Sequence, residues 1–170
     1  MQLTTERLTI RPFTDADEAP MIRLLRNTQV AKTYMLPDFA DDEAARPLFR
    51  RFVTLSNDPA RAVVGLFHGD ALVGFMNDVS QENGQIEMGY VVDPACHNQG
   101  FCTEALTAMI AALHARGFRR VICGAFEDNP ASLRVMEKAG MQPIDFIEMI
   151  DYRGKTHRCV FRAADNANDE

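Results

Sequence analysis

The segment from Val92 to Phe101 combines residue types that can bind an anion through the protein backbone. An apolar stretch ending at Val92 is followed by a loop through Pro94 and by a helical pattern that begins near Gly100. The first amides of a helix have no partner within the helix and carry the positive end of its dipole. Because glycine lets a ligand approach closely, such a loop can bind a diphosphate without a lysine. On its residues alone, it is equally compatible with a plain strand-to-helix turn.

Composition narrows the classes of protein to which the chain can belong. It has 170 residues, 46% of them hydrophobic and 25% charged, which is typical of one soluble domain. The net charge of −6 argues against a broad nucleic-acid-binding face. No apolar run is long enough to span a membrane, and the first residues lack the order of a signal peptide, so we expect a cytoplasmic protein. The four cysteines lack zinc-ligand spacing, so we expect reduced thiols and no metal.

The hydrophobic pattern predicts an α+β fold along the chain. Helices are expected from Asp15 to about Arg26 and within 41–55, where Pro47 either begins or kinks the helix. Two more are expected over 100–116 and from Pro130 to Gly140, with Asn129 as the cap of the second. Strands are expected over 7–13, 61–67, 72–79, 85–92, 119–125, 141–150 and 156–162. The strand–helix–strand segment near the centre predicts one parallel strand pair. Residues 1–163 are expected to form a single domain, followed by a polar tail over 164–170.

Several separated motifs, in order, resemble the Gcn5-related N-acetyltransferase (GNAT) superfamily. They are Thr5-Glu6-Arg7-Leu8-Thr9-Ile10-Arg11-Pro12, Gly74, Ile86-Glu87-Met88-Gly89-Tyr90-Val91-Val92-Asp93-Pro94, the Gly100 loop, Glu104-Ala105, Asn129-Pro130-Ala131-Ser132 and Glu137-Lys138-Ala139-Gly140-Met141. The resemblance is to the branch with the ribosomal-protein-alanine N-acetyltransferases. It implies a mostly antiparallel central sheet of about seven strands with about four helices. A β-α-β crossover would bind the donor, acetyl-CoA.

The resemblance also implies which residues bind the donor. Backbone groups of Tyr90, Val91 and Val92 would bind the pantetheine and the thioester carbonyl, and a loop would bind the diphosphate. Only Gly100 of that loop matches the family pattern, because His97 stands in place of Arg or Gln and Cys102 in place of Gly or Ala. The other donor-binding residues implied are Asn98, Gln99, Phe101, Asn129, Ser132 and Arg134.

Two residues are candidates for catalysis through the resemblance. Glu87 would accept a proton from the amine, although it is equally a structural or substrate-orienting carboxylate. Ser132 would donate a proton to the leaving thiolate, and its alternative is a first-turn serine that satisfies local amides. Arg134 and Lys138 share a helix face and are equally a solvated basic pair. Tyr34 and Phe39 are either acceptor-pocket lining or ordinary core.

The function predicted is transfer of an acetyl group from acetyl-CoA to a primary amine, either a protein N-terminus or a small amine. The alternatives are a catalytically silent acyl-CoA-binding regulator, for which the departures at His97 and Cys102 leave room, and an enzyme that uses another acyl-CoA. No nucleic acid or membrane partner is expected, and the chain would be a monomer or a homodimer.

Overall fold

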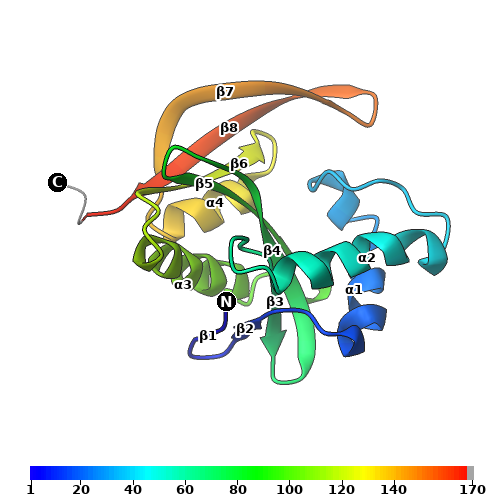
Figure 1. The fold of residues 1–170 in the computed structure, drawn as a ribbon. Helices are drawn as coiled ribbons and strands as arrows, with labels where there is room; N and C mark the ends of the chain where they lie inside the picture. The colour runs from blue at the N-terminus through cyan, green and yellow to red at the C-terminus, as the bar shows by residue number, and fades with distance from the viewer. Residues whose placement is uncertain (168–170) are drawn as a thin grey trace. The chain divides into compact units, whose positions relative to one another are not determined.

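A computed structural model describes residues 1–167 and shows a mixed α+β fold (Figure 1). The elements are β1 (Leu3–Thr4), β2 (Thr9–Arg11), α1 (Glu18–Leu25), α2 (Asp42–Ser56), β3 (Val64–His68), β4 (Ala71–Glu82), β5 (Gln85–Val92), α3 (Phe101–Ala115), β6 (Arg120–Phe126), α4 (Pro130–Lys138), β7 (Gln142–Tyr152) and β8 (Lys155–Asp165), with 3-10 turns at Asp15–Asp17, Val30–Lys32 and Pro94–Cys96. Neighbouring strands follow the order β1-β2-β3-β4-β5-β6-β8-β7. The predicted α+β class and mostly antiparallel sheet are confirmed. The described residues hold one strand more than expected, because the two-residue β1 pairs with β2.

The chain divides into two compact units. The first contains Met1–Asn77 and Tyr90–Phe101, and the second contains Asp78–Gly89 and the described part of Cys102–Glu170. The long strands β4 and β5 each contribute one part to each unit. Each unit therefore has its own hydrogen-bonded strands and its own helices.

The first unit builds its core from β2–β4 and from the helices α1 and α2, which pack against each other. The helix α2 buries Ala45, Phe49, Phe52 and Ser56, which recur at the helical period. Its first turn is fixed by Asp41, whose carboxylate accepts a hydrogen bond of 2.9 Å from the Ala44 amide. From the sheet, Phe67 of β3 and Leu72 and Phe75 of β4 join the same core. The apolar faces of two helices and a strand pair thus make one continuous core.

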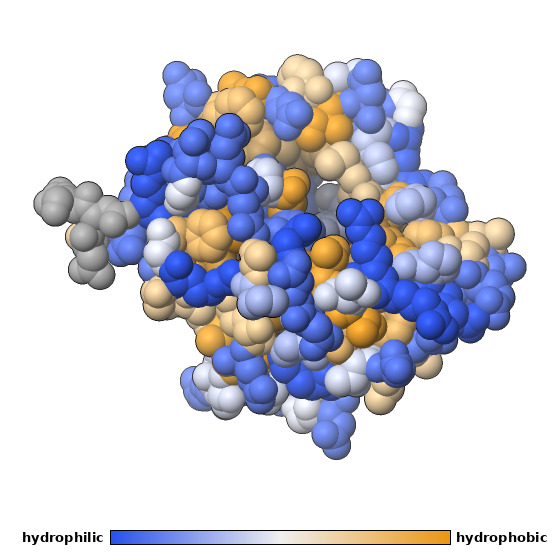
Figure 2. Space-filling model, in the orientation of Figure 1, coloured by the Kyte–Doolittle hydropathy of each residue, from blue (hydrophilic) through white to orange (hydrophobic). Residues whose placement is uncertain are grey.

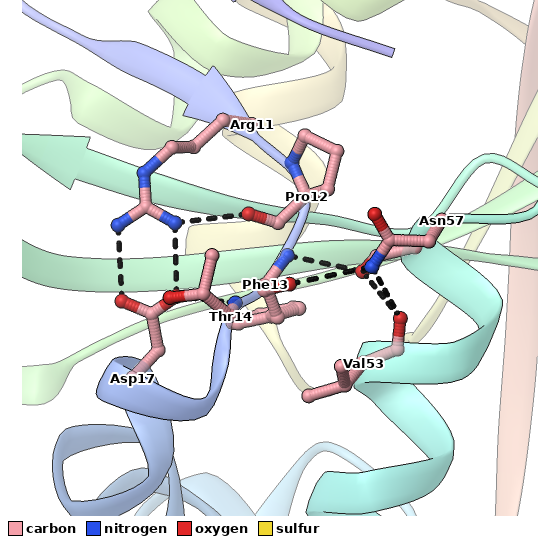
Figure 3. A network of polar contacts seen from close by, with 8 residues as sticks. Arg11, Pro12, Phe13, Thr14, Asp17, Val53 and Asn57 are labelled. Atoms are coloured by element: carbon pink, nitrogen blue, oxygen red, sulfur yellow. Dashed lines mark hydrogen bonds and ion pairs between the residues drawn. The ribbon is translucent and has the colours of Figure 1, made fainter.

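A polar network at the end of β2 fixes the start of this core (Figure 3). Arg11 donates two hydrogen bonds to the buried carboxylate of Asp17, at 2.9 and 3.0 Å, and its guanidinium lies 3.6 Å above the Phe67 ring centroid. Burial alone would raise the pKa of Asp17, but the hydrogen bonds from Arg11 and Thr14 outweigh it and lower that pKa. The Phe13 amide donates to the Ser56 hydroxyl of α2 at 3.0 Å. The network therefore holds β2, α1 and α2 in one arrangement.

The second unit contains the parallel pair that the strand–helix–strand segment predicts. Strand β5 pairs with β6 in parallel, with Gln85 opposite Arg120 and Glu87 opposite Ile122. Strand β8 pairs antiparallel with β6 and with β7, which forms a long hairpin with β8 (Figure 1). Phe146, Ile147 and Met149 of β7 are exposed, and Figure 2 shows apolar residues among polar ones over this hairpin, at the top of the view.

The prediction that α2 begins at Pro47 or kinks there is wrong about the start. The helix begins at Asp42, and Pro47 is its sixth residue. A proline at that position removes one helical hydrogen bond, to the carbonyl of Glu43. Glu43 is exposed, so water can satisfy that carbonyl. The cap at Asp41 and the buried apolar face stabilise the turn that precedes the proline.

Residues 164 and 165, which the sequence assigns to the polar tail, belong to strand β8 in the structure. Strand β8 continues through Asp165, with Val121 opposite Ala164 and Arg120 opposite Asp165. Arg120 also binds the Asp165 carboxylate through two hydrogen bonds, at 2.5 and 3.0 Å. The pairing extends the strand because a cross-strand ion pair compensates for the polar composition. Residues 168–170 of the expected tail lie outside the described residues.

Candidate active site

The loop between β5 and α3 belongs to the first unit and presents its backbone to solvent. Asp93 begins it by accepting a hydrogen bond of 2.9 Å from the Ala95 amide, which closes the short turn at Pro94–Cys96. His97, Asn98, Gln99 and Gly100 are all exposed. Asn98 has φ +60° and Gly100 has φ +81°, both in the left-handed region that asparagine and glycine tolerate best. The loop is therefore an exposed turn with left-handed residues, a backbone conformation that can bind an anionic ligand.

His97 helps to hold this loop onto the end of β5. Its Nε2 lies 3.0 Å from the Val92 carbonyl oxygen, to which it donates a hydrogen bond. One of the two ring nitrogens of His97 is thus occupied by a hydrogen bond within the protein. The imidazole therefore ties the loop to the end of β5.

Arg7 contacts the same loop from a distant part of the sequence. Its Nη1 donates a hydrogen bond of 2.7 Å to the Gln99 carbonyl, 92 residues away. Its guanidinium carbon lies 4.8 Å from the centroid of the Phe101 ring, which is buried. A Cβ atom on Gly100 would lie 3.3 Å from Nη2 of Arg7. Sequence reasoning missed these contacts, because no local spacing connects Arg7 with the loop.

The end of β5 lies unusually close to β4 at Gly74. A Cβ atom at Gly74 would lie 2.2 Å from the Val91 carbonyl oxygen and 3.0 Å from Cα of Val92, so only glycine fits there. The Asp93 amide donates to the Val73 carbonyl at 2.8 Å. Val91 and Val92 are buried, and Tyr90 is half-buried. This approach fixes the backbone from Tyr90 to Val92.

Tyr34 and Phe39 are partly buried and pack against the core of the first unit. The Tyr34 hydroxyl donates a hydrogen bond to the Asn77 side chain, and its ring meets that of Phe75 edge to face at 5.4 Å. Burial raises the pKa of Tyr34 far above its ordinary value, which the bond to Asn77 only partly offsets. Tyr34 is therefore a neutral hydrogen-bonding phenol at physiological pH.

Glu87 lies on β5 in the second unit, opposite Ile122 of β6, and is half-buried. The Ser80 hydroxyl donates a long hydrogen bond of 3.4 Å to its Oε2. Burial raises the pKa of Glu87, the bond from Ser80 lowers it, and the charge of Glu148 on β7 raises it again. The net direction is upward, as a general base that works near neutral pH requires.

The start of α4 brings Asn129 and Ser132 together, also in the second unit. The Asn129 side chain accepts a hydrogen bond of 3.3 Å from the Ser132 amide, and Pro130 is the first helical residue. The predicted cap is confirmed. Ser132 is half-buried at the third helical position, while Arg134 and Lys138 are exposed.

The thiol of Cys102, one residue after Phe101, has a raised pKa. Burial raises its pKa to about 12. Burial likewise raises the pKa of the Cys159 thiol to about 11, with further contributions from Glu148 and Glu87. Both side chains are therefore neutral at physiological pH.

Comparisons with known proteins connect this geometry to a family. A family model described as "Acetyltransferase (GNAT) domain" matches residues 7–142, a segment that contains Glu87, the Gly100 loop and Ser132. The chain belongs to this GNAT family. It is therefore an acyltransferase, and its similarity to curated relatives agrees. It is 26% identical over 160 residues to the uncharacterized N-acetyltransferase YoaA of Bacillus subtilis (strain 168), covering 91% of this chain and 90% of that protein.

Solved structures of other acetyltransferases share the fold. RimL, a ribosomal L7/L12 alpha-N-protein acetyltransferase in complex with coenzyme A, aligns with a TM-score of 0.86 at 18% identity, covering 99% of this chain and all of that one (100%). A ribosomal-protein-S5-alanine acetyltransferase from Vibrio fischeri aligns with a TM-score of 0.83 at 14% identity, covering 100% of this chain and 99% of that one. The predicted family resemblance is confirmed.

Across residues 1–167, we found no group of three or more His, Cys, Asp or Glu side chains placed to hold a metal ion. Within the same range, every helix is too short or too polar to cross a bilayer.

Proposed function

We propose that this GNAT protein transfers the acetyl group of acetyl-CoA directly to a primary amine, in a ternary complex. The observation that carries the proposal is the exposed left-handed backbone at Asn98 and Gly100, in the segment that the family model matches. A thioester is already activated, so catalysis requires positioning and two proton transfers. Coenzyme A bound to the structurally similar RimL supports the choice of donor.

The donor would bind through main-chain groups more than through charged side chains. Backbone amides of the loop from His97 to Cys102 would bind the diphosphate, helped by the dipole of α3. Backbone groups from Tyr90 to Val92 would bind the pantetheine and the thioester carbonyl. Asn129 would contribute through its side chain, and Arg134 would reach a phosphate.

The two proton transfers are assigned to Glu87 and Ser132. The Glu87 carboxylate accepts the proton that the amine nitrogen loses as its lone pair forms the new bond to the acetyl carbon. The carbon–sulfur bond breaks, and the Ser132 hydroxyl gives its proton to the departing sulfur. Water then returns a proton to Ser132 and takes the proton held by Glu87, which restores both groups. The raised pKa of Glu87 supports its role, because a stronger base removes the proton more readily at neutral pH.

The acceptor would be a protein N-terminus or a small amine, with Tyr34, Phe39 and Glu87 contacting it. RimL is by its name an alpha-N-protein acetyltransferase, and the Vibrio fischeri enzyme is by its name a ribosomal-protein-S5-alanine acetyltransferase. Both names indicate a protein acceptor, which supports a peptide here. In this proposal, residues 1–163 serve a single activity, in the cytoplasm, as a monomer or a homodimer.

The test measures thiol release from acetyl-CoA with a panel of amines. The panel contains peptides that begin with alanine or serine, the same peptides with a blocked N-terminus, polyamines and aminoglycosides, and mass spectrometry identifies the acetylated product. We expect turnover with at least one free amine and none with the blocked peptides. Binding of acetyl-CoA without turnover on any acceptor would refute the proposal and favour a silent acyl-CoA-binding regulator.

Donor choice is tested in the same assay by replacing acetyl-CoA with succinyl-CoA. A higher kcat/KM for succinyl-CoA would show that the preferred donor is succinyl-CoA and not acetyl-CoA. The reaction would still be acyl transfer to an amine. The matched control is Ser132→Ala protein from the same preparation scheme, which distinguishes turnover by this chain from turnover by a contaminant.

A further inference from the structure

Arg7 makes two contacts with the segment from Gln99 to Phe101 and lies close to Gly100 between them. Its Nη1 donates to the Gln99 carbonyl at 2.7 Å, and its guanidinium lies 4.8 Å from the Phe101 ring centroid. Its Nη2 comes within 3.3 Å of the position that a Cβ atom on Gly100 would occupy. Phe101 is 3% exposed, so the ring that the guanidinium stacks on is a fixed support.

The hydrogen bond to the Gln99 carbonyl fixes the orientation of the whole peptide group between Gln99 and Gly100. The described residues contain no cis peptide bond. In a trans peptide the carbonyl and the following amide point in opposite directions within one plane. Because Arg7 holds the Gln99 carbonyl toward itself, the Gly100 amide hydrogen points away from Arg7. The orientation of this donor is thus set by a side chain from the N-terminal region.

We propose that Arg7 is a positioning residue for the donor's diphosphate, a role that rests on the proposed use of acetyl-CoA. It turns the Gly100 amide toward the anion and keeps the Gln99 carbonyl oxygen, which would repel it, on the opposite side. Its positive charge adds attraction within the same turn. Arg7 thus supplies a positive charge to the loop from outside it, whereas His97, which stands where the family pattern has Arg or Gln, bonds to the Val92 carbonyl.

The donors whose binding depends on Arg7 are therefore acyl thioesters that carry a diphosphate. A thioester that ends at the pantetheine lacks the group that the Gly100 amide would bind. Arg7 would make no difference to such a donor, whereas a general loss of structure would weaken both donors equally. This contrast separates positioning from folding.

The experiment measures kcat/KM with acetyl-CoA and with S-acetyl-pantetheine, and the Kd of CoA by calorimetry, for Arg7→Gln. A hydrogen bond to a charged group corresponds to a factor of about ten to one hundred in binding. We expect kcat/KM for acetyl-CoA to fall by roughly that factor and the Kd of CoA to rise by the same factor. The value for S-acetyl-pantetheine should change less than about twofold. Equal losses with both donors would overturn the proposal.

Two further variants separate positioning by Arg7 from simple charge attraction and from a general effect of removing a surface arginine. Arg7→Lys keeps the charge without the planar fork, so it should recover only part of the CoA affinity, and full recovery would replace positioning with simple charge attraction. Arg116→Gln is the matched control, because Arg116 is also exposed and lies 5.7 Å from a ring centroid, that of Phe118. Its CoA affinity should equal that of the wild type. Calorimetry with CoA tests Arg7 even if no amine is acetylated, so failure of the proposed reaction is distinguishable from failure of this inference.

Discussion

Replacing Gly100 with alanine should weaken donor binding far more than it weakens the fold. At φ +81° a residue with a Cβ atom costs about 1–2 kcal/mol relative to glycine. The added carbon would also lie 3.3 Å from Nη2 of Arg7, the movable end of a flexible side chain, so that contact adds little strain. For a chain of this size, about 1 kcal/mol corresponds to a fall in Tm of about 2–4 °C. We therefore expect Tm to fall by roughly 2–8 °C.

Gly140 offers a matched control for this substitution. Its φ is +84°, and a Cβ atom there would meet nothing within 4 Å. Gly140→Ala should therefore lower Tm by a similar amount, while the Kd of CoA, measured by calorimetry, stays at the wild-type value. Gly100→Ala should raise that Kd at least about tenfold, because a distorted loop misdirects its amides. Wild-type affinity in Gly100→Ala protein, together with a lowered Tm, would refute the assignment of this loop to the diphosphate.

Three further substitutions test other parts of the molecule. Glu87→Gln should lower kcat by roughly 10²-fold and shift the pH–rate profile upward, because only an amine that is already neutral can then attack; an unchanged profile would leave Glu87 as scaffold. Ser132→Ala should lower kcat by roughly 10²-fold with little change in the KM for acetyl-CoA, and equal effects on both would exclude the acid role. Asp17→Asn should reduce the free energy of unfolding by about 1.5–3 kcal/mol at neutral pH. The lowered pKa of Asp17 means that its stabilisation is present above the unfolded pKa of about 4 and is lost as pH falls through the folded value, so urea titrations of the two proteins should converge in acid.

The sequence predicted the elements well where local signals agree. Asn129 and Pro130 together specify a helix start, and the structure has the Asn129 side chain bound to the Ser132 amide. The strands predicted over 61–67 and 72–79 are joined at Gly69–Asp70, residue types that favour tight turns, and Gly69 has a positive φ. Such features depend on a few neighbouring residues, so a pattern can reveal them.

What the sequence did not reveal depends on residues that are far apart along the chain. Pro47 is a local signal against a helix, yet the buried face of α2 and its cap at Asp41 outweigh it. The need for glycine at position 74 arises from Val91, which is on another strand. The register of β8 carries the strand past the point where its composition becomes polar, because Arg120 pairs with Asp165. Rules based on the spacing of neighbouring residues cannot identify these partners.

The bond between Arg7 and Gln99 also has a consequence for folding. It closes a segment of 92 residues, and the entropy of closing so long a segment must be recovered by contacts that form with it. Contacts of such high sequence separation tend to form late, after local helices and hairpins. We expect the loop to acquire its final shape near the end of folding, when Arg7 docks onto it, rather than during the growth of α3.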